Sequence, residues 1–261
     1  MPVSRARPTC DGCRNGDVLD FTFSMAFQPI IDLATGGPFA YEALVRGPEG
    51  QSAASVLAQV TPANRYGFDQ QCRVKAIQTA AAAGLLETPA RLSINFLPNA
   101  VYQPRSCIQL TLTTAAAIGF PTDRLIFEFT ENEEMVDPCH VARIVESYRE
   151  MGFGTALDDF GAGYAGLNLL ARFQPDMIKL DMDLIRGLDA SLPRRLIIEA
   201  VVRMCEGLGV AVIAEGIETE PELEALRALG VRYVQGFLFA RPALERLPVV
   251  RLSVPAAARS A

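Results

Sequence analysis

Short apolar segments recur along the chain and alternate with stretches in which apolar residues are spaced three or four positions apart. Strands of a sheet covered on both faces are almost entirely apolar, whereas the second spacing is that of amphipathic helices. The alternation predicts strands at Ser24–Ile31, Phe39–Arg46, Arg91–Asn95, Leu125–Thr130, Thr155–Asp158, Met177–Asp181, Val210–Ala214 and Tyr233–Gln235. It predicts helices at Ser52–Val60, Phe68–Ala83, Cys107–Ile118, Pro138–Met151, Ala165–Phe173, Leu192–Leu208 and Pro221–Leu229.

The connections between these strands indicate the fold class. Residues 34–38 join the first two strands by a loop short enough for an antiparallel pair, and helices separate the later strands, as parallel βα units require. The sequence therefore predicts an α/β fold, a (β/α)8 TIM-like barrel with one antiparallel strand. We expect this domain at 21–247. The polar segment 1–20, broken by proline and glycine, and the alanine-rich tail 248–261 are expected to be flexible.

A polar side chain stands at or near the downstream end of most predicted strands. Since buried strands should be apolar, and since the carboxyl ends of parallel strands meet at one rim of a barrel, these side chains are expected to share one pocket. They are Glu42, Asn95, Glu128, Asp158, Lys179, Glu215 and Gln235.

The chemistry of this set points to divalent cations. Carboxylate and amide oxygens are the ligands of hard ions such as magnesium and manganese, and the set contains neither histidine nor cysteine. The adjacent acids Asp158 and Asp159 can both face one site where the strand ends and the backbone turns, which favours a pair of cations. His140 is the single histidine, which excludes a histidine-dependent triad. Taken alone, each of these charges would be read as a solvated group or an ion-pair partner; their joint occurrence favours a site.

Composition and charge narrow the function classes. The chain has 261 residues, of which 50% are hydrophobic, so it can bury a large core. Its formal net charge is −6 with acids and bases interspersed, which argues against polymeric nucleic acid as a partner. The sequence shows no apolar run of signal-peptide or membrane-spanning type, so we expect a cytoplasmic protein without membrane insertion.

The six cysteines leave two interpretations open. Cys10 and Cys13 form one CxxC motif near the N-terminus, and the others are scattered. In the first interpretation all are reduced thiols. In the second, Cys10 and Cys13 bind zinc or sense redox state, with Cys139 and His140 completing a tetrahedral set.

Several short motifs, in order, resemble the EAL-domain phosphodiesterases of bacteria, and the resemblance extends from Ser24 to Pro242. Such enzymes hydrolyse cyclic di-GMP to linear pGpG with two magnesium or manganese ions, on a barrel with one antiparallel strand. The motifs are Phe27-Gln28-Pro29-Ile30, Glu42-Ala43-Leu44 with Arg46, the Asn95 segment, Glu128-Phe129-Thr130-Glu131, Asp158-Asp159-Phe160-Gly161-Ala162-Gly163-Tyr164, Pro175-Asp176-Met177-Ile178-Lys179-Leu180-Asp181, Ala214-Glu215-Gly216-Ile217-Glu218-Thr219 and Gln235-Gly236-Phe237.

The resemblance implies a role for each matching residue. One metal ion would be held by Glu42, Asn95, Glu128 and Asp158, and the other by Asp158, Asp159 and Glu215. Lys179 and Gln235 would contact the water network around the nucleophile, Arg46 would bind a phosphate group, and Gln28 would line the substrate groove. Glu131 would anchor the loop Phe160–Leu167, and Glu218 would be a further loop-anchoring acid behind the metal ligands.

Two departures from the family pattern leave the metal ligands intact. Ala165 and Gly166 stand where serines are usual, and Phe129 stands where an aliphatic residue is common. The leading interpretation is an active hydrolase of cyclic di-GMP that forms a homodimer. The sequence leaves open whether regulation acts through the N-terminal segment, the dimer interface, a regulatory protein partner or not at all. The alternatives are a catalytically silent cyclic di-GMP receptor or interaction module, and a metal-dependent phosphodiesterase for another nucleotide.

Overall fold

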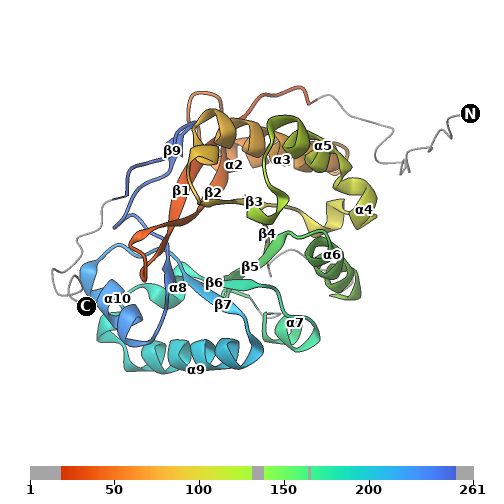
Figure 1. Ribbon diagram of the computed structural model, residues 1–261. Coiled ribbons are helices and arrows are strands. Elements are labelled where there is room, and N and C mark those ends of the chain that lie inside the picture. Colours follow the sequence, from red (N-terminus) through yellow and green to blue (C-terminus); the bar gives the residue numbers. More distant parts are fainter. Residues whose placement is uncertain (1–18, 131–137, 164–165, 251–261) are drawn as a thin grey trace, which may run out of the picture.

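The computed structural model describes residues 19–130, 138–163 and 166–250, so most of the two expected flexible ends lies outside it. Strands and helices alternate, and Figure 1 shows the helices arranged around the outside of the strands. The strands are β1 (Ser24–Asp32), β2 (Gly37–Arg46), β3 (Arg91–Asn95), β4 (Leu125–Thr130), β5 (Gly154–Phe160), β6 (Met177–Leu180), β7 (Ala211–Ala214), β8 (Tyr233–Val234) and β9 (Ala243–Leu244). The α-helices are α2 (Ala53–Leu57), α3 (Arg65–Ala82), α4 (Pro104–Cys107), α5 (Gln109–Ile118), α6 (Pro138–Glu150), α7 (Gly166–Arg172), α8 (Met182–Ile185), α9 (Leu192–Leu208) and α10 (Glu220–Ala228).

The first eight strands close into a barrel. Strands β2 to β8 follow one another in parallel, and β1 completes the ring by pairing with both β8 and β2. Both pairings of β1 are antiparallel, which confirms the predicted barrel with one reversed strand. The short β9 pairs antiparallel with β1 at Ala26 and Phe27, and the hydrophobic pattern did not reveal this element.

One boundary differs from its prediction for a clear reason. The strand expected to extend to Asp181 ends at Leu180. Asp181 instead caps the short helix α8, because its side chain accepts a hydrogen bond from the backbone N–H of Asp183. An Asp carboxylate satisfies one of the free N–H groups at a helix start, which favours the helix over a longer strand.

Apolar side chains fill the inside of the barrel at the end where the parallel strands begin. They form a cluster separate from the main core, which lies between the strands and the helices. Phe39 and Tyr233 pack against this inner cluster with their ring centroids 4.4 Å apart, and Arg91 and Arg232 each lie 5.1 Å from one of these rings. The buried members are Ile30, Ala40, Ile126, Ala156, Met177 and Ile213.

A buried ion pair lies between the barrel wall and the outer helices. Arg73 and Asp69, one turn apart on α3, form a salt bridge, and neither is more than 2% exposed. Arg73 also donates to the hydroxyl of Tyr148 on α6 at 3.3 Å. Asp69 accepts from the backbone N–H of Leu97, just beyond β3, at 2.9 Å. The pair therefore ties two helices to the chain that follows β3.

Among the described residues, no helix combines the length and the apolar character that crossing a membrane requires.

Candidate active site

A ring of polar side chains lies directly above the apolar layer inside the barrel. Side chains on a strand alternate between its two faces, so the residue two positions after an inward apolar residue also points inward. On the parallel strands this rule leads from Ala40 to Glu42 and from Met177 to Lys179, and on the reversed strand β1 it leads back from Ile30 to Gln28. Strands β1 to β6 each contribute one residue to the ring, and two more residues directly follow β7 and β8. The ring comprises Gln28, Glu42, Asn95, Glu128, Asp158, Lys179, Glu215 and Gln235.

A cavity of about 310 Å³ opens at this end of the barrel. It is lined by most of the residues that the sequence predicted for the site, so the structure brings them together. Asn95 and Glu128 lie beside it rather than on its surface, since Glu128 is completely buried. The sequence-predicted lining residues are Gln28, Glu42, Arg46, Asp158, Asp159, Lys179, Glu215, Glu218 and Gln235.

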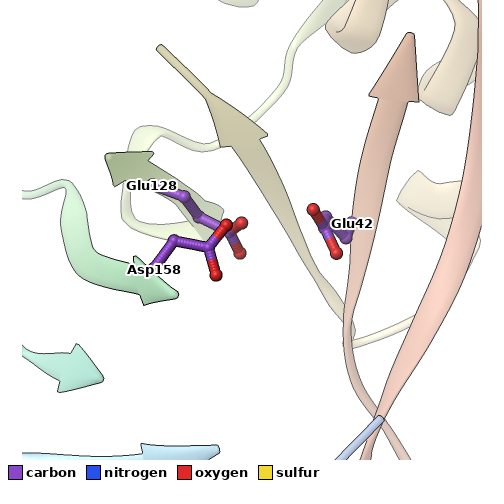
Figure 2. Close-up of side chains that lie close together, drawn as sticks. All are labelled: Glu42, Glu128 and Asp158. Carbon is purple, nitrogen blue, oxygen red and sulfur yellow. The ribbon is translucent and has the colours of Figure 1, made fainter. Parts of the chain in front are cut away.

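Four carboxylates surround the ammonium group of Lys179. Its Nζ lies 2.7 Å from Glu215, 2.8 Å from Glu128, 3.2 Å from Asp158 and 3.4 Å from Glu42. Figure 2 shows Glu42, Glu128 and Asp158 converging from three separate strands. Lys179 is 1% exposed, so water does not replace its ammonium group as the partner of these carboxylates.

The proximity of these charges displaces their pKa values. Burial alone would lower the pKa of Lys179, but the surrounding carboxylates raise it well above its usual value, so the ammonium stays charged. Burial, reinforced by the neighbouring acids, raises the pKa of Glu128 to about 8 and that of Glu215 well above its usual range. The pKa of Asp158 is raised for the same main reason, whereas Lys179, Gln235 and Asn95 outweigh burial and lower that of Glu42. A single ammonium group therefore does not supply enough positive charge to balance the four carboxylates around it.

The donor geometry fits a pair of divalent cations. One oxygen each from Glu42, Glu128 and Asp158 lies within 4.8 Å of the others, and the same holds for Asp158, Asp159 and Glu215. Asp158 belongs to both groups, as a ligand shared by two cations would. Hard cations prefer carboxylate oxygens, and they would supply the positive charge that the cluster lacks.

The backbone is strained where the two groups meet. Asp159 has a φ of 55°, in the left-handed region that residues other than glycine seldom adopt. Its N–H donates to Oδ1 of the preceding Asp158 at 2.9 Å. Both carboxylates line one cavity, as the sequence predicted, but they do so from within β5 rather than beyond its end, because the register of β5 with β6 shifts between Leu157 and Phe160.

Three side-chain amides support the carboxylates. Asn95 donates to Glu42 Oε1 at 2.9 Å, and Gln235 donates to Glu42 Oε2 at 2.7 Å. Gln235 also donates to Gln28, which itself donates to the carbonyl oxygen of Ala240. Within the described part of the chain, Oε1 of Gln235 is buried without a hydrogen-bond partner.

The mouth of the cavity carries Arg46 and Glu218. Arg46 is partly buried, and its guanidinium donates to the carbonyl of Val45 at 2.7 Å, which leaves further N–H groups for an anion. Glu218 forms an exposed ion pair with Arg186 at 3.0 Å. Its side chain therefore contacts the loop after α8 rather than a metal ligand.

A different glutamate holds the loops near Glu215, and the sequence did not single it out. Glu222 is 6% exposed, and its Oε1 accepts from the backbone N–H of Gly187 at 3.1 Å. Its Oε2 accepts from the N–H groups of Glu218 and Thr219, each at 3.1 Å. The sequence signal was the pattern of a capping box, in which Thr219 is followed three residues later by Glu222.

Some sequence predictions fall where the structure gives no description. Glu131, Cys10 and Cys13 lie outside the described residues. Cys139 is exposed, and Nε2 of His140 lies 2.6 Å from the carbonyl oxygen of Val101. Zinc binding or redox sensing by the N-terminal CxxC stays a prediction.

The family model described as EAL domain matches residues 17–242. The blue light- and temperature-regulated antirepressor BluF of Escherichia coli strain K12 is 33% identical over 240 residues, which are 92% of this chain and 59% of BluF. The cyclic di-GMP phosphodiesterase PA2567 of Pseudomonas aeruginosa is 33% identical over 228 residues, which are 85% of this chain and 38% of that protein. The chain thus spans less than two thirds of the length of these relatives.

Solved structures show the same barrel. A standalone versatile EAL protein from Vibrio cholerae O395 in its c-di-GMP bound form matches with a TM-score of 0.86 and 50% identity, over 90% of this chain and 98% of that one. A manganese and cyclic di-GMP complex of BlrP1 from Klebsiella pneumoniae matches with a TM-score of 0.80 and 36% identity, over 87% of this chain and 58% of that one.

Proposed function

Because the chain belongs to the EAL domain family, we propose that it is a metal-dependent phosphodiesterase that hydrolyses cyclic di-GMP to linear pGpG. The observation that carries the proposal is the complete set of oxygen donors around Lys179, in a cavity with an arginine at its mouth. The relative PA2567, named as a cyclic di-GMP phosphodiesterase, and the nucleotide-bound structural neighbours support it.

The metal site uses donors from separate strands. We assign Glu42, Asn95, Glu128 and Asp158 to one divalent cation, magnesium or manganese, and Asp158, Asp159 and Glu215 to a second. When bound, such cations supply positive charge that acidifies water and neutralises charge on a phosphodiester. Since no histidine lies among these donors, the carboxylates are the side chains in this set that take up and release the protons that move during hydrolysis, while Lys179 keeps its own proton.

The remaining residues act on the substrate and on the ligands. Hydrolysis forms a bond between a water oxygen and phosphorus, breaks one P–O3′ bond, and transfers a proton to the departing 3′ oxygen. Lys179, which stays protonated, keeps the carboxylate oxygens in place through its hydrogen bonds and offers positive charge to the reacting phosphate. Arg46 binds the non-bridging phosphate oxygens, and Gln28 and Gln235 line the groove beside them.

Incubation of the purified chain with cyclic di-GMP and either magnesium or manganese tests the proposal. We expect pGpG as the product by chromatography, and no product in EDTA or from the Asp158→Asn variant. Competition by other cyclic nucleotides shows whether the site is specific. Binding of cyclic di-GMP with persistent absence of pGpG in both metals would refute the enzymatic function.

One observation favours a second candidate. BluF, a relative that aligns with 92% of this chain, is named as an antirepressor. A protein-interaction role, with cyclic di-GMP sensed rather than degraded, is therefore the alternative. In either case we propose that the chain forms a homodimer, which sedimentation velocity tests directly. We also propose that a regulatory protein partner binds it.

A further inference from the structure

Ser93 is a buried hydroxyl residue inside the barrel that the proposed mechanism does not use. It lies on β3 two positions before Asn95, so both side chains point inward. Its neighbour in the register of β2 is Glu42. The side chain is 0% exposed and does not line the cavity, so a direct contact with substrate is excluded in this arrangement.

The hydroxyl of Ser93 contacts one proposed metal ligand. Its Oγ donates to Oε1 of Glu128 at 2.5 Å. The other oxygen of the same carboxylate, Oε2, accepts from Lys179 at 2.8 Å. Each oxygen of Glu128 thus has its own donor, one from β3 and one from β6. The carboxylate cannot rotate about its last bond without losing both hydrogen bonds.

We propose that Ser93 is a positioning residue that holds the Glu128 carboxylate in the orientation needed to bind a divalent cation. The inference rests on the proposed function, because it concerns the cation assigned to Glu42, Asn95, Glu128 and Asp158. Glu128 is 0% exposed, so no solvent can replace the missing donor once the hydroxyl is removed. Loss of a hydrogen-bond partner behind a metal ligand typically weakens metal binding by about 10- to 100-fold.

Titration of the full chain with manganese alone, with the heat of binding measured by calorimetry, tests the inference without relying on turnover. We expect Ser93→Ala to bind manganese about 10- to 100-fold more weakly than the wild type. Ser93→Thr keeps the hydroxyl and is expected to recover most of the affinity. If Ser93→Ala does not fold, Ser93→Cys fills the same space with a weak donor and carries the same expectation of weakened binding.

A matched control separates this role from general effects on the fold. Thr155, at the start of β5, donates its hydroxyl to the carboxylate of Asp176 at 2.8 Å. Thr155→Val removes the same kind of bond at the opposite end of the barrel and is expected to leave manganese affinity unchanged. Binding of cyclic di-GMP in EDTA is expected to be equal in Ser93→Ala and the wild type, because Ser93 does not line the cavity.

The outcomes distinguish this inference from the proposed function. Wild-type manganese affinity in folded Ser93→Ala overturns the inference, and so does an equal loss in Thr155→Val. If the wild type binds manganese and forms no pGpG, the enzymatic function fails, while weaker binding by Ser93→Ala still supports the role of Ser93. A wild-type chain that binds no manganese refutes both.

Discussion

Replacing Lys179 by methionine removes the positive charge at the centre of the cavity and keeps a side chain of similar length. Lys179 is 1% exposed, and four carboxylates lie within 3.4 Å of its ammonium group. Removing one partner of a buried ion pair costs about 3 to 5 kcal/mol, because the other charge stays buried without compensation. At about 2 to 4 °C per kcal/mol for a chain of this size, we expect Tm in EDTA to fall by roughly 6 to 20 °C.

Thermal unfolding of the Lys179→Met variant, followed by circular dichroism in EDTA and in saturating manganese, checks this expectation. Divalent cations supply positive charge to the same carboxylates, so the difference in Tm from the wild type should narrow in manganese while turnover stays low. The same substitution at Lys75, on the outer helix α3, is the control and should leave turnover intact. An unchanged Tm of Lys179→Met in EDTA would refute the reasoning, because it would mean that the carboxylates neutralise themselves at little cost.

Three further expectations concern the scaffold. Arg73→Met leaves the carboxylate of Asp69 buried without its ion-pair partner, so the free energy of unfolding measured in urea should fall by about 3 to 5 kcal/mol. Adding Asp69→Asn to Arg73→Met should recover part of this loss. An equal loss in the single and the double variant would contradict a charge effect. Burial raises the pKa of Tyr148 from 10.0 to about 12, so the unfolded chain loses this proton first. The free energy of unfolding should therefore decline by up to about 2.7 kcal/mol as pH rises from about 10 to 12. Urea titrations at several pH values measure this decline, and the part due to Tyr148 should be missing in Tyr148→Phe. A methyl group at Gly236 would collide with the backbone of Ile217, whose N–H donates to the carbonyl oxygen of Gln235. Gly236→Ala should therefore displace Gln235 from the cavity and lose cyclic di-GMP binding, measured by calorimetry. Binding at wild-type affinity would contradict this packing argument.

The barrel and most of its polar ring could be predicted because both follow from alternation along the strand. On the parallel strands other than β3, where Ser93 precedes Asn95, a residue of the apolar layer stands two positions before the polar residue of the ring, as in Ile126 and Glu128 or Ile213 and Glu215. This spacing is visible in the sequence without any knowledge of distant contacts. The reversed strand β1 follows the same rule backwards, which places Gln28 before Ile30.

Residues whose role depends on a distant partner could not be predicted in the same way. Ser93 reads as an ordinary strand residue until β4 brings Glu128 next to it, 35 positions along the chain. Arg73 reads as a charge on an amphipathic helix, and only the packing of α3 against α6 shows it buried beside Tyr148. Glu222 carries a local capping signal, but its contact with Gly187 depends on how α10 meets the loop after α8.

The charge of the cavity links metal loading to the stability of the fold. Glu42, Glu128, Asp158 and Glu215 share one ammonium group, and burial makes their joint ionisation unfavourable, as the raised pKa of Glu128 near 8 indicates. Cations that bind the folded chain and not the unfolded one stabilise it by about 2.7 kcal/mol at a concentration one hundred times Kd. Under the proposed function, the same carboxylates that hold the metal ions therefore make the metal-free barrel less stable than its apolar layer alone would allow. A stabilising effect of manganese on the wild type that disappears in Asp158→Asn, a ligand assigned to both cations, is the thermodynamic signature that this coupling requires.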